Sequence, residues 1–253
     1  MKRFCFTVDD NIRFLKDLTK EPRGSIFDHP YLSMYRRLHE KFGLKVQLNL
    51  FYRMDGFDLT QMTDRYKDEF DSASDWLKLS FHSECENVEP YITSGYDEVY
   101  SHCKAVHNEI LRFASPRSLG KTTTIHYCKA TKEGLKALKD NGIKGLLGLY
   151  YYPRVSYELI ENAVELIRKG EVAALDGISH ASIDMVINDL LYSELVPTLT
   201  PYLLRNDIRV MIHEQPFYSD HRLYQPDFEK KLTAVFDKLT ENGYISHFFE
   251  EMI

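Results

Sequence analysis

Several strand-like segments of this chain end in side chains that can bind a metal ion or transfer a proton. The first segment ends in two adjacent carboxylates, Asp9 and Asp10. Three others carry a histidine at or near their ends, and these segments are Trp76–His82, Thr122–Tyr127 with His126, and Ile208–His213. Neighbouring carboxylates repel each other unless a cation, a proton or water intervenes, and carboxylate oxygen is a good metal ligand. A metal site is therefore one interpretation of this pattern.

Each of these residues also has an ordinary structural interpretation. Asp9 or Asp10 could cap a following helix, because aspartate and asparagine are favoured at that position. A lone histidine at a strand end is more often a hydrogen-bonded structural residue. The recurrence of such residues after several strands favours function instead. If the strands are parallel, all these side chains converge at one end of a β/α barrel, where barrels place their active sites.

The composition excludes some classes of function. The 253 residues, 43% of them hydrophobic, suffice for a large core. A net charge of −6 argues against nucleic acid as a partner, because binding phosphate requires a basic face. No apolar run approaches the ~20 residues of a membrane span, and the N-terminus lacks the features of a signal peptide. The four cysteines are scattered without C-x-x-C spacing, so we expect a reduced, cytoplasmic protein that is not bound to a membrane.

Strand and helix signals alternate along the whole chain. Helical spacing predicts helices over His29–Phe42, with Gly43 as a stop signal, and over Leu59–Phe70. No linker, repeat or low-complexity tract indicates a boundary, so we predict one domain over residues 1–253. Alternation at this length is typical of a parallel barrel or a doubly wound sheet. Candidate ligands after several different strands favour the barrel, because an open sheet gathers its ligands at one switch point.

Four short motifs resemble those of the polysaccharide deacetylase family. Phe6-Thr7-Val8-Asp9-Asp10 is similar to the family's T-F-D-D motif, and Met211-Ile212-His213 is similar to its Leu-x-His motif. His82-Ser83-Glu84-Cys85-Glu86 resembles H-[ST]-x-x-H, with glutamate in place of the second histidine. Thr124-Ile125-His126-Tyr127 resembles the R-P-P-Y region without its arginine and prolines. The resemblance spans nearly the whole chain and implies a distorted (β/α)7-type barrel.

The resemblance also implies roles for individual residues. Asp9 would be the catalytic base, His213 the catalytic acid, and Asp10 and His82 ligands of a divalent metal. Zinc is the expected metal, because nitrogen and carboxylate ligands suit it. Three possibilities remain open for the rest of the site. Glu86 could complete it, His126 could complete it instead, or no metal binds.

Two classes of function follow from the resemblance. The first is a metal-dependent hydrolase that removes an acyl group, in particular N-acetyl, from a carbohydrate or a related amide. The second is a catalytically degenerate barrel that binds a carbohydrate or a protein partner, because fold alone does not decide function. The ligand would be a small molecule or an oligosaccharide, and Tyr127 and Glu214 are the expected substrate-binding residues. The sequence does not indicate an oligomeric state.

Overall fold

The computed structural model describes residues 1–86, 91–151, 154–157 and 159–253 of the chain. The strands are β1 (Lys2–Asn11), β2 (Val46–Met54), β3 (Phe57–Asp58), β4 (Leu77–Cys85), β5 (Thr122–Thr123), β6 (Gly145–Gly148), β7 (Ala173–Leu175), β8 (Ile178–Ser182), β9 (Met185–Val186), β10 (Asp207–His213) and β11 (Tyr244–Ser246). The α-helices are α1 (Arg13–Lys20), α2 (Pro30–Phe42), α3 (Lys67–Ala73), α4 (Tyr96–Phe113), α5 (Lys132–Asp140), α6 (Glu161–Arg168), α7 (Leu195–Leu199) and α8 (Phe228–Glu241).

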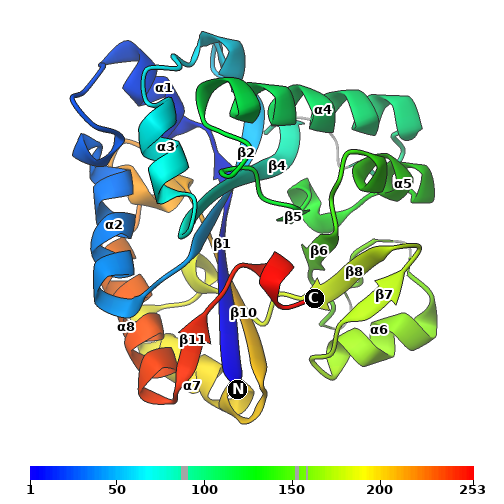
Figure 1. The fold of residues 1–253 in the computed structure, drawn as a ribbon. Coiled ribbons are helices and arrows are strands. Elements are labelled where there is room, and N and C mark those ends of the chain that lie inside the picture. The colour runs from blue at the N-terminus through cyan, green and yellow to red at the C-terminus, as the bar shows by residue number, and fades with distance from the viewer. Residues whose placement is uncertain (87–90, 152–153, 158) are drawn as a thin grey trace.

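The strands follow one another around a distorted barrel. Central strand β1 pairs in parallel with β10 on one side and with β2 on the other, and β2 pairs in parallel with β4 (Figure 1). In a second sheet, β6 pairs in parallel with β5 and β8. Strand β8 leads into β9, which pairs with β10 and so joins the two sheets. The predicted β/α barrel with parallel strands is confirmed.

The other junction between the sheets, from β4 to β5, is thinner. Leu79 of β4 forms a single parallel bridge with Leu119, shortly before β5. The hydroxyl of Thr123 donates a hydrogen bond to the carbonyl of Phe81, and the hydroxyl of Ser80 donates one to the carbonyl of Thr122. Side-chain hydrogen bonds therefore replace part of the backbone ladder here, and the barrel departs from regular closure.

Strand β1 is buried on both faces, as expected for a central parallel strand. Phe4 and Phe6 face the outer helices, where the ring centroid of Phe6 lies 5.0 Å from that of Phe236 in α8. Cys5 belongs instead to a small inner cluster with Met211 of β10. Because side chains alternate along a strand, the same inward face continues through Thr7 to Asp9.

The helices around the barrel follow the sequence signals in most places. Helix α2 begins at Pro30 after a His29 cap and ends at Phe42. It is followed by Gly43, whose φ of 62° is the left-handed conformation that stops a helix. The predicted helix over Leu59–Phe70 is wrong in its first half. Asp58 caps a 3-10 turn there, the hydroxyl of Thr63 accepts a hydrogen bond from the backbone N–H of Arg65, and α3 starts only at Lys67.

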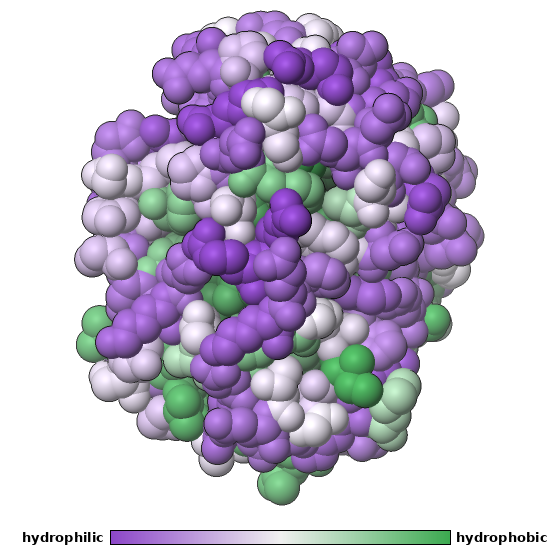
Figure 2. All heavy atoms as spheres, turned by 60° about the vertical axis from the view of Figure 1, so that its left-hand side comes forward, coloured by the Kyte–Doolittle hydropathy of each residue, from purple (hydrophilic) through white to green (hydrophobic). Residues whose placement is uncertain are grey.

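The outer helix faces are mainly hydrophilic. Figure 2 brings the helices on the left of Figure 1 forward and shows polar residues over most of that face, with apolar residues scattered among them. This distribution fits helices that bury one apolar stripe against a barrel. No helix within the described ranges has the length and hydropathy that crossing a membrane requires.

Candidate active site

The acidic pair at the end of β1 lies in one cavity, although neighbouring strand residues normally point to opposite faces. Asp9 points inward, is 2% exposed, and its Oδ1 accepts a 2.7 Å hydrogen bond from Nδ2 of Asn49. Asp10 has a φ of 64°, in the left-handed region, and its Oδ2 accepts a 2.7 Å hydrogen bond from Nε2 of Gln215. The unusual backbone of Asp10 therefore turns the second carboxylate back toward the site of the first.

Asp10 meets two histidines in a group that could hold a metal ion. Oδ1 of Asp10 lies 2.9 Å from Nε2 of His82 and 3.3 Å from Nδ1 of His126. The same two nitrogen atoms are 3.2 Å apart. Two nitrogen atoms and one carboxylate oxygen thus converge and could serve as three ligands of one metal ion. A catalytic zinc site has three protein ligands and keeps its fourth position open for water or substrate.

The remaining nitrogen atom of each histidine is fixed by a backbone carbonyl. Nδ1 of His82 lies 2.6 Å from the carbonyl oxygen of Thr124, and Nε2 of His126 lies 3.0 Å from that of Glu86. A ring nitrogen next to a carbonyl must carry the proton. A neutral ring therefore offers its other nitrogen, the one facing Asp10, to a metal, whereas a protonated ring donates a hydrogen bond from that nitrogen to Asp10. Metal-binding histidines are usually oriented in this way. The donor set therefore fits a divalent metal.

The two carboxylates differ in their affinity for a proton. Burial raises the pKa of Asp9 above its usual value, and the nearby histidines and Asn49 offset only part of this effect. Burial acts on Asp10 too, but its hydrogen bonds to His126 and His82 outweigh burial and hold its pKa well below the usual value. Asp10 is thus ionised and ready to bind a cation, whereas Asp9 takes up a proton more readily.

His213 lies across the site from the metal-binding group. It is the last residue of β10 and pairs in register with Asp9. Oδ1 of Asn188 lies 2.9 Å from Nδ1 of His213 and accepts the backbone N–H of the same residue at 3.1 Å. An amide oxygen can only accept, so Nδ1 carries the proton. Nε2 is then the nitrogen that remains free to exchange a proton with a ligand.

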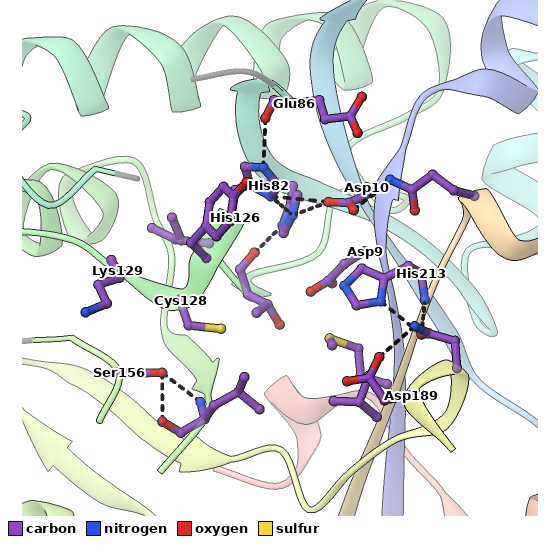
Figure 3. Close-up of a pocket in the computed structure, with 18 of the residues that line it drawn as sticks. Asp9, Asp10, His82, Glu86, His126, Cys128, Lys129, Ser156, Asp189 and His213 are labelled. Atoms are coloured by element: carbon purple, nitrogen blue, oxygen red, sulfur yellow. Dashed lines mark hydrogen bonds and ion pairs between the residues drawn. The ribbon is translucent and has the colours of Figure 1, made fainter. Parts of the chain in front are cut away.

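These side chains line a cavity of about 850 Å³, the size of a small-molecule site. Figure 3 shows Asp9, Asp10, His82, His126 and His213 around this cavity, from the ends of different strands and one loop. The expectation that the five residues share one mouth of the barrel agrees with this arrangement. The sequence did not predict Asn49, Asn188 and Gln215, because a neutral amide in a strand or a loop carries no signal of its own.

His126 lies in a turn, whereas the sequence predicted it at the end of a strand. The expected strand over Thr122–Tyr127 ends at Thr123, and His126 starts a 3-10 turn. Tyr127 and Cys128 both have left-handed backbones, with φ values of 60° and 56°, and two such residues in succession end the extended conformation of a strand. The turn nevertheless brings the His126 ring beside His82.

Of the two alternatives for the third ligand, the geometry favours His126 over Glu86. Glu86 contributes its backbone carbonyl to the His126 ring, whereas its carboxylate points away from the two histidines (Figure 3). The group of residues that could hold a metal accordingly contains His126 and lacks Glu86. A glutamate at the position of the second motif histidine therefore does not remove the donor set.

The two residues expected to bind substrate lie in different surroundings. Tyr127 is 62% exposed and lines the cavity, and its ring centroid lies 4.2 Å from that of His126. Glu214 is 1% exposed and is absent from the wall of this cavity. The expectation that Glu214 binds substrate is therefore corrected, because its carboxylate does not face this cavity.

The Glu214 carboxylate instead binds the start of α1. It accepts hydrogen bonds from the backbone N–H groups of Ile12, Arg13 and Phe14 at 2.8, 3.0 and 2.9 Å. The hydroxyl of Tyr218 donates a fourth at 2.9 Å. All its accepting capacity is used within the protein, so its function is structural.

Comparison with known proteins bears on the fold. No family model matches the chain, and no curated protein matches it. Among solved structures, 99% of the chain superposes on 89% of a family 4 acetyl xylan esterase from Clostridium thermocellum in complex with a cobalt ion, with a TM-score of 0.56 and 11% identity. It superposes equally on 64% of a CE4-family pseudoenzyme from Bacillus anthracis, with a TM-score of 0.57 and 11% identity.

An enzyme of another kind shares the same architecture. The chain superposes over 99% of its length on 40% of 4-alpha-glucanotransferase from Thermococcus litoralis, with a TM-score of 0.63 and 16% identity. Identities this low establish the fold and leave the reaction open. The chain has the distorted (β/α)7-barrel fold of the CE4 esterases, the group of the polysaccharide deacetylases that its motifs resemble.

Proposed function

We propose that this protein is a metal-dependent hydrolase that removes an acyl group, in particular N-acetyl, from a carbohydrate or a related amide. The observation that carries the proposal is the arrangement of five side chains in one cavity. Asp10, His82 and His126 form a group suited to a divalent metal, and Asp9 and His213 lie beside it. This arrangement combines a group that could hold a Lewis acid with a candidate acid and a candidate base, the combination that metal-assisted amide hydrolysis uses.

Zinc is the metal that we propose for the Asp10–His82–His126 group, because two imidazole nitrogens and one carboxylate are a common zinc donor set. A bound divalent metal would polarise the acyl carbonyl and increase the acidity of water. Gln215 holds the outer oxygen of Asp10, and the carbonyls of Thr124 and Glu86 hold the outer nitrogens of the histidines. These contacts orient the donors before any ligand arrives.

Asp9 is the proposed general base. Its carboxylate is buried and held by Asn49, and its raised pKa favours uptake of a proton from the attacking water. His213 is the proposed general acid, which would give a proton from Nε2 to the departing amine. Asn188 keeps the His213 ring in position for this transfer.

Tyr127 is the proposed contact for the sugar. Its exposed ring lies at the edge of the cavity next to His126, and aromatic rings offer an apolar face to the C–H groups of a saccharide. A sugar held by this ring would lie over the mouth of the barrel, with its acyl group directed toward the metal-binding residues.

The proposal is tested by acyl release from a panel of N-acetylated amino sugars, other amides and esters. Asp9→Asn and His213→Ala should each lose about 10²–10⁴-fold in rate, the usual effect of removing a general base or acid. Both variants should retain the metal content and thermal stability of the parent. Asp64→Asn, which changes an exposed carboxylate that does not line the cavity, is the matched control. Full activity of Asp9→Asn would refute the mechanism, and no acyl release from any compound by the metal-loaded protein would favour a binding function.

A further inference from the structure

The cavity has a basic wall in addition to the acidic and metal-binding one. Lys129 and Arg154 both line it, from the loops that follow β5 and β6. Asp9, Asp10 and His213 come from the ends of β1 and β10. Figure 3 shows Lys129 and Asp9 on opposite sides of the cavity. A ligand that spans the cavity from Asp9 to Lys129 therefore meets a carboxylate at one end and a cation at the other.

The two cations differ from the acids of the cavity in how they are paired. Asp9 and Asp10 are held by the internal hydrogen bonds given above. Within the described ranges, no hydrogen bond or ion pair involves Lys129 or the Arg154 side chain, and the Arg154 guanidinium lies 5.6 Å from the centroid of the Tyr151 ring. The Arg154 guanidinium also lies within electrostatic reach of Cys128, the residue that precedes Lys129 and another residue of the cavity wall.

The negative net charge of the molecule makes the presence of Lys129 and Arg154 in the cavity wall informative about the charge of the ligand. The chain carries a net charge of −6, so its overall field repels anions, and binding one requires cations near the binding point. Arginine and lysine together are a common arrangement for holding a carboxylate or a phosphate, since the guanidinium gives a planar fork of donors and the ammonium a point charge.

We propose that the substrate carries an anionic group, a carboxylate or a phosphate, which Lys129 and Arg154 bind while the acyl group lies at the Asp10–His82–His126 end. This inference rests on the proposed hydrolase function and narrows its substrate class to acidic N-acyl sugars. A cavity of about 850 Å³ holds a sugar with such a substituent.

The test compares three substrates of the same acyl type: N-acetylglucosamine, its 6-phosphate and an N-acetylated aminouronic acid. For the parent protein, kcat/KM should be at least about 10-fold higher for one of the two anionic sugars than for the neutral one. The two anionic sugars decide between phosphate and carboxylate. The double variant Lys129→Ala with Arg154→Ala should lose this preference through a higher KM, and added salt should weaken the preference of the parent.

A matched double variant controls for the loss of two surface cations. Lys144→Ala with Arg65→Ala removes an exposed lysine and an exposed arginine that lies 5.0 Å from a tyrosine ring, and neither residue lines the cavity. The control should keep the preference for the anionic sugar. Equal kcat/KM for neutral and anionic sugars in the parent, or an unchanged preference in the Lys129/Arg154 variant, would overturn the inference while leaving the hydrolase function intact.

A binding measurement separates the two proposals if no hydrolysis is found. Calorimetric titration with the same three sugars needs no turnover. Tighter binding of an anionic sugar to the parent than to the Lys129/Arg154 variant would support the anion site even in a protein without hydrolase activity. Equal binding of all three sugars by both proteins would overturn it.

Discussion

Asp9 and Asp10, adjacent at the end of β1, have pKa values shifted in opposite directions because their partners differ. Asp9 faces the barrel interior and a neutral amide, so burial raises its pKa. Asp10 faces two imidazole rings, which hold its pKa well below the usual value. Carboxylates whose surroundings separate their pKa values in this way can serve as base and ligand side by side.

The metal-binding group makes a prediction about three single variants. Asp10→Ala and His126→Ala should each reduce metal bound by the purified protein far below one equivalent, because each removes one of three converging donors. Glu86→Ala should retain the metal, because the side chain of Glu86 points away and its carbonyl remains. Elemental analysis of protein prepared without chelator gives the result.

One outcome with these variants would contradict the prediction. Loss of metal in Glu86→Ala together with full retention in His126→Ala would show that the glutamate is the third ligand. The sequence could not decide this point. Glu86 follows His82 at the motif spacing, whereas His126 lies in an imperfect motif, and only the left-handed backbone of Tyr127 and Cys128 explains how that loop reaches the site.

Sequence reasoning at the residue level correctly placed Asp9, Asp10, His82 and His213, which lie at or near strand ends, in one cavity, whereas their roles there stay predictions. It failed for Glu214, because a carboxylate next to a motif histidine looks the same in sequence whether it faces a cavity or a helix end. Neutral amides such as Asn188 were missed for a related reason. Their contacts depend on distant strands.

At the level of elements, Glu214 connects β10 to α1. Helix α1 has the apolar Ile12 at its N-cap position, which offers no side-chain oxygen. Its first backbone N–H groups would lack acceptors in a buried setting if Glu214 were absent. A carboxylate from the end of a neighbouring strand takes the place of the usual local cap.

We therefore expect Glu214→Ala to lower the free energy of unfolding by about 2–3 kcal/mol or more, the cost of leaving buried backbone groups unsatisfied. Glu229→Ala is the control, because Glu229 forms an exposed ion pair with Arg37, and such pairs contribute about 0–1 kcal/mol. Denaturant unfolding measures both variants. Equal effects would show that the contacts of Glu214 contribute little to stability.

At the level of the whole molecule, alternation of strands and helices narrowed the fold to a parallel barrel or a doubly wound sheet, and candidate ligands after several different strands favoured the barrel, which the structure confirms. The thin junction between β4 and β5 could not be predicted, because it depends on the hydroxyls of Ser80 and Thr123 reaching backbone carbonyls of the neighbouring strand. The likeness of fold to esterases and to a glucanotransferase shows why the architecture alone does not name a reaction.

Two buried histidines away from the site predict how stability depends on pH. Burial lowers the pKa values of His107 and His180 to about 4 each. The unfolded chain then binds protons that the folded protein does not, once the pH falls below about 6.5. Stability should therefore decrease as the pH falls from about 6.5 toward 4, by up to about 1.4 kcal/mol per pH unit for each histidine.

The slope of stability against pH distinguishes the contribution of these histidines from that of other titrating groups. His107→Asn and His180→Asn replace each ring with a side chain that does not titrate. Each variant should show a shallower loss of stability between pH 6.5 and 5 than the parent, whatever its absolute stability. Chelator should be present so that metal binding does not contribute. Parallel curves for parent and variants would contradict the predicted role of burial.

We infer that Asp10, His82 and His126 hold a metal on which acyl release depends. The most direct measurement is a titration of chelator-stripped protein with zinc while acetate release from the best N-acetylated sugar of the panel is followed. We predict no release without metal, and a rise that levels off at one equivalent in the parent and is absent in Asp10→Ala. Release that is independent of metal, or zinc bound at one equivalent without any release, would contradict the claim.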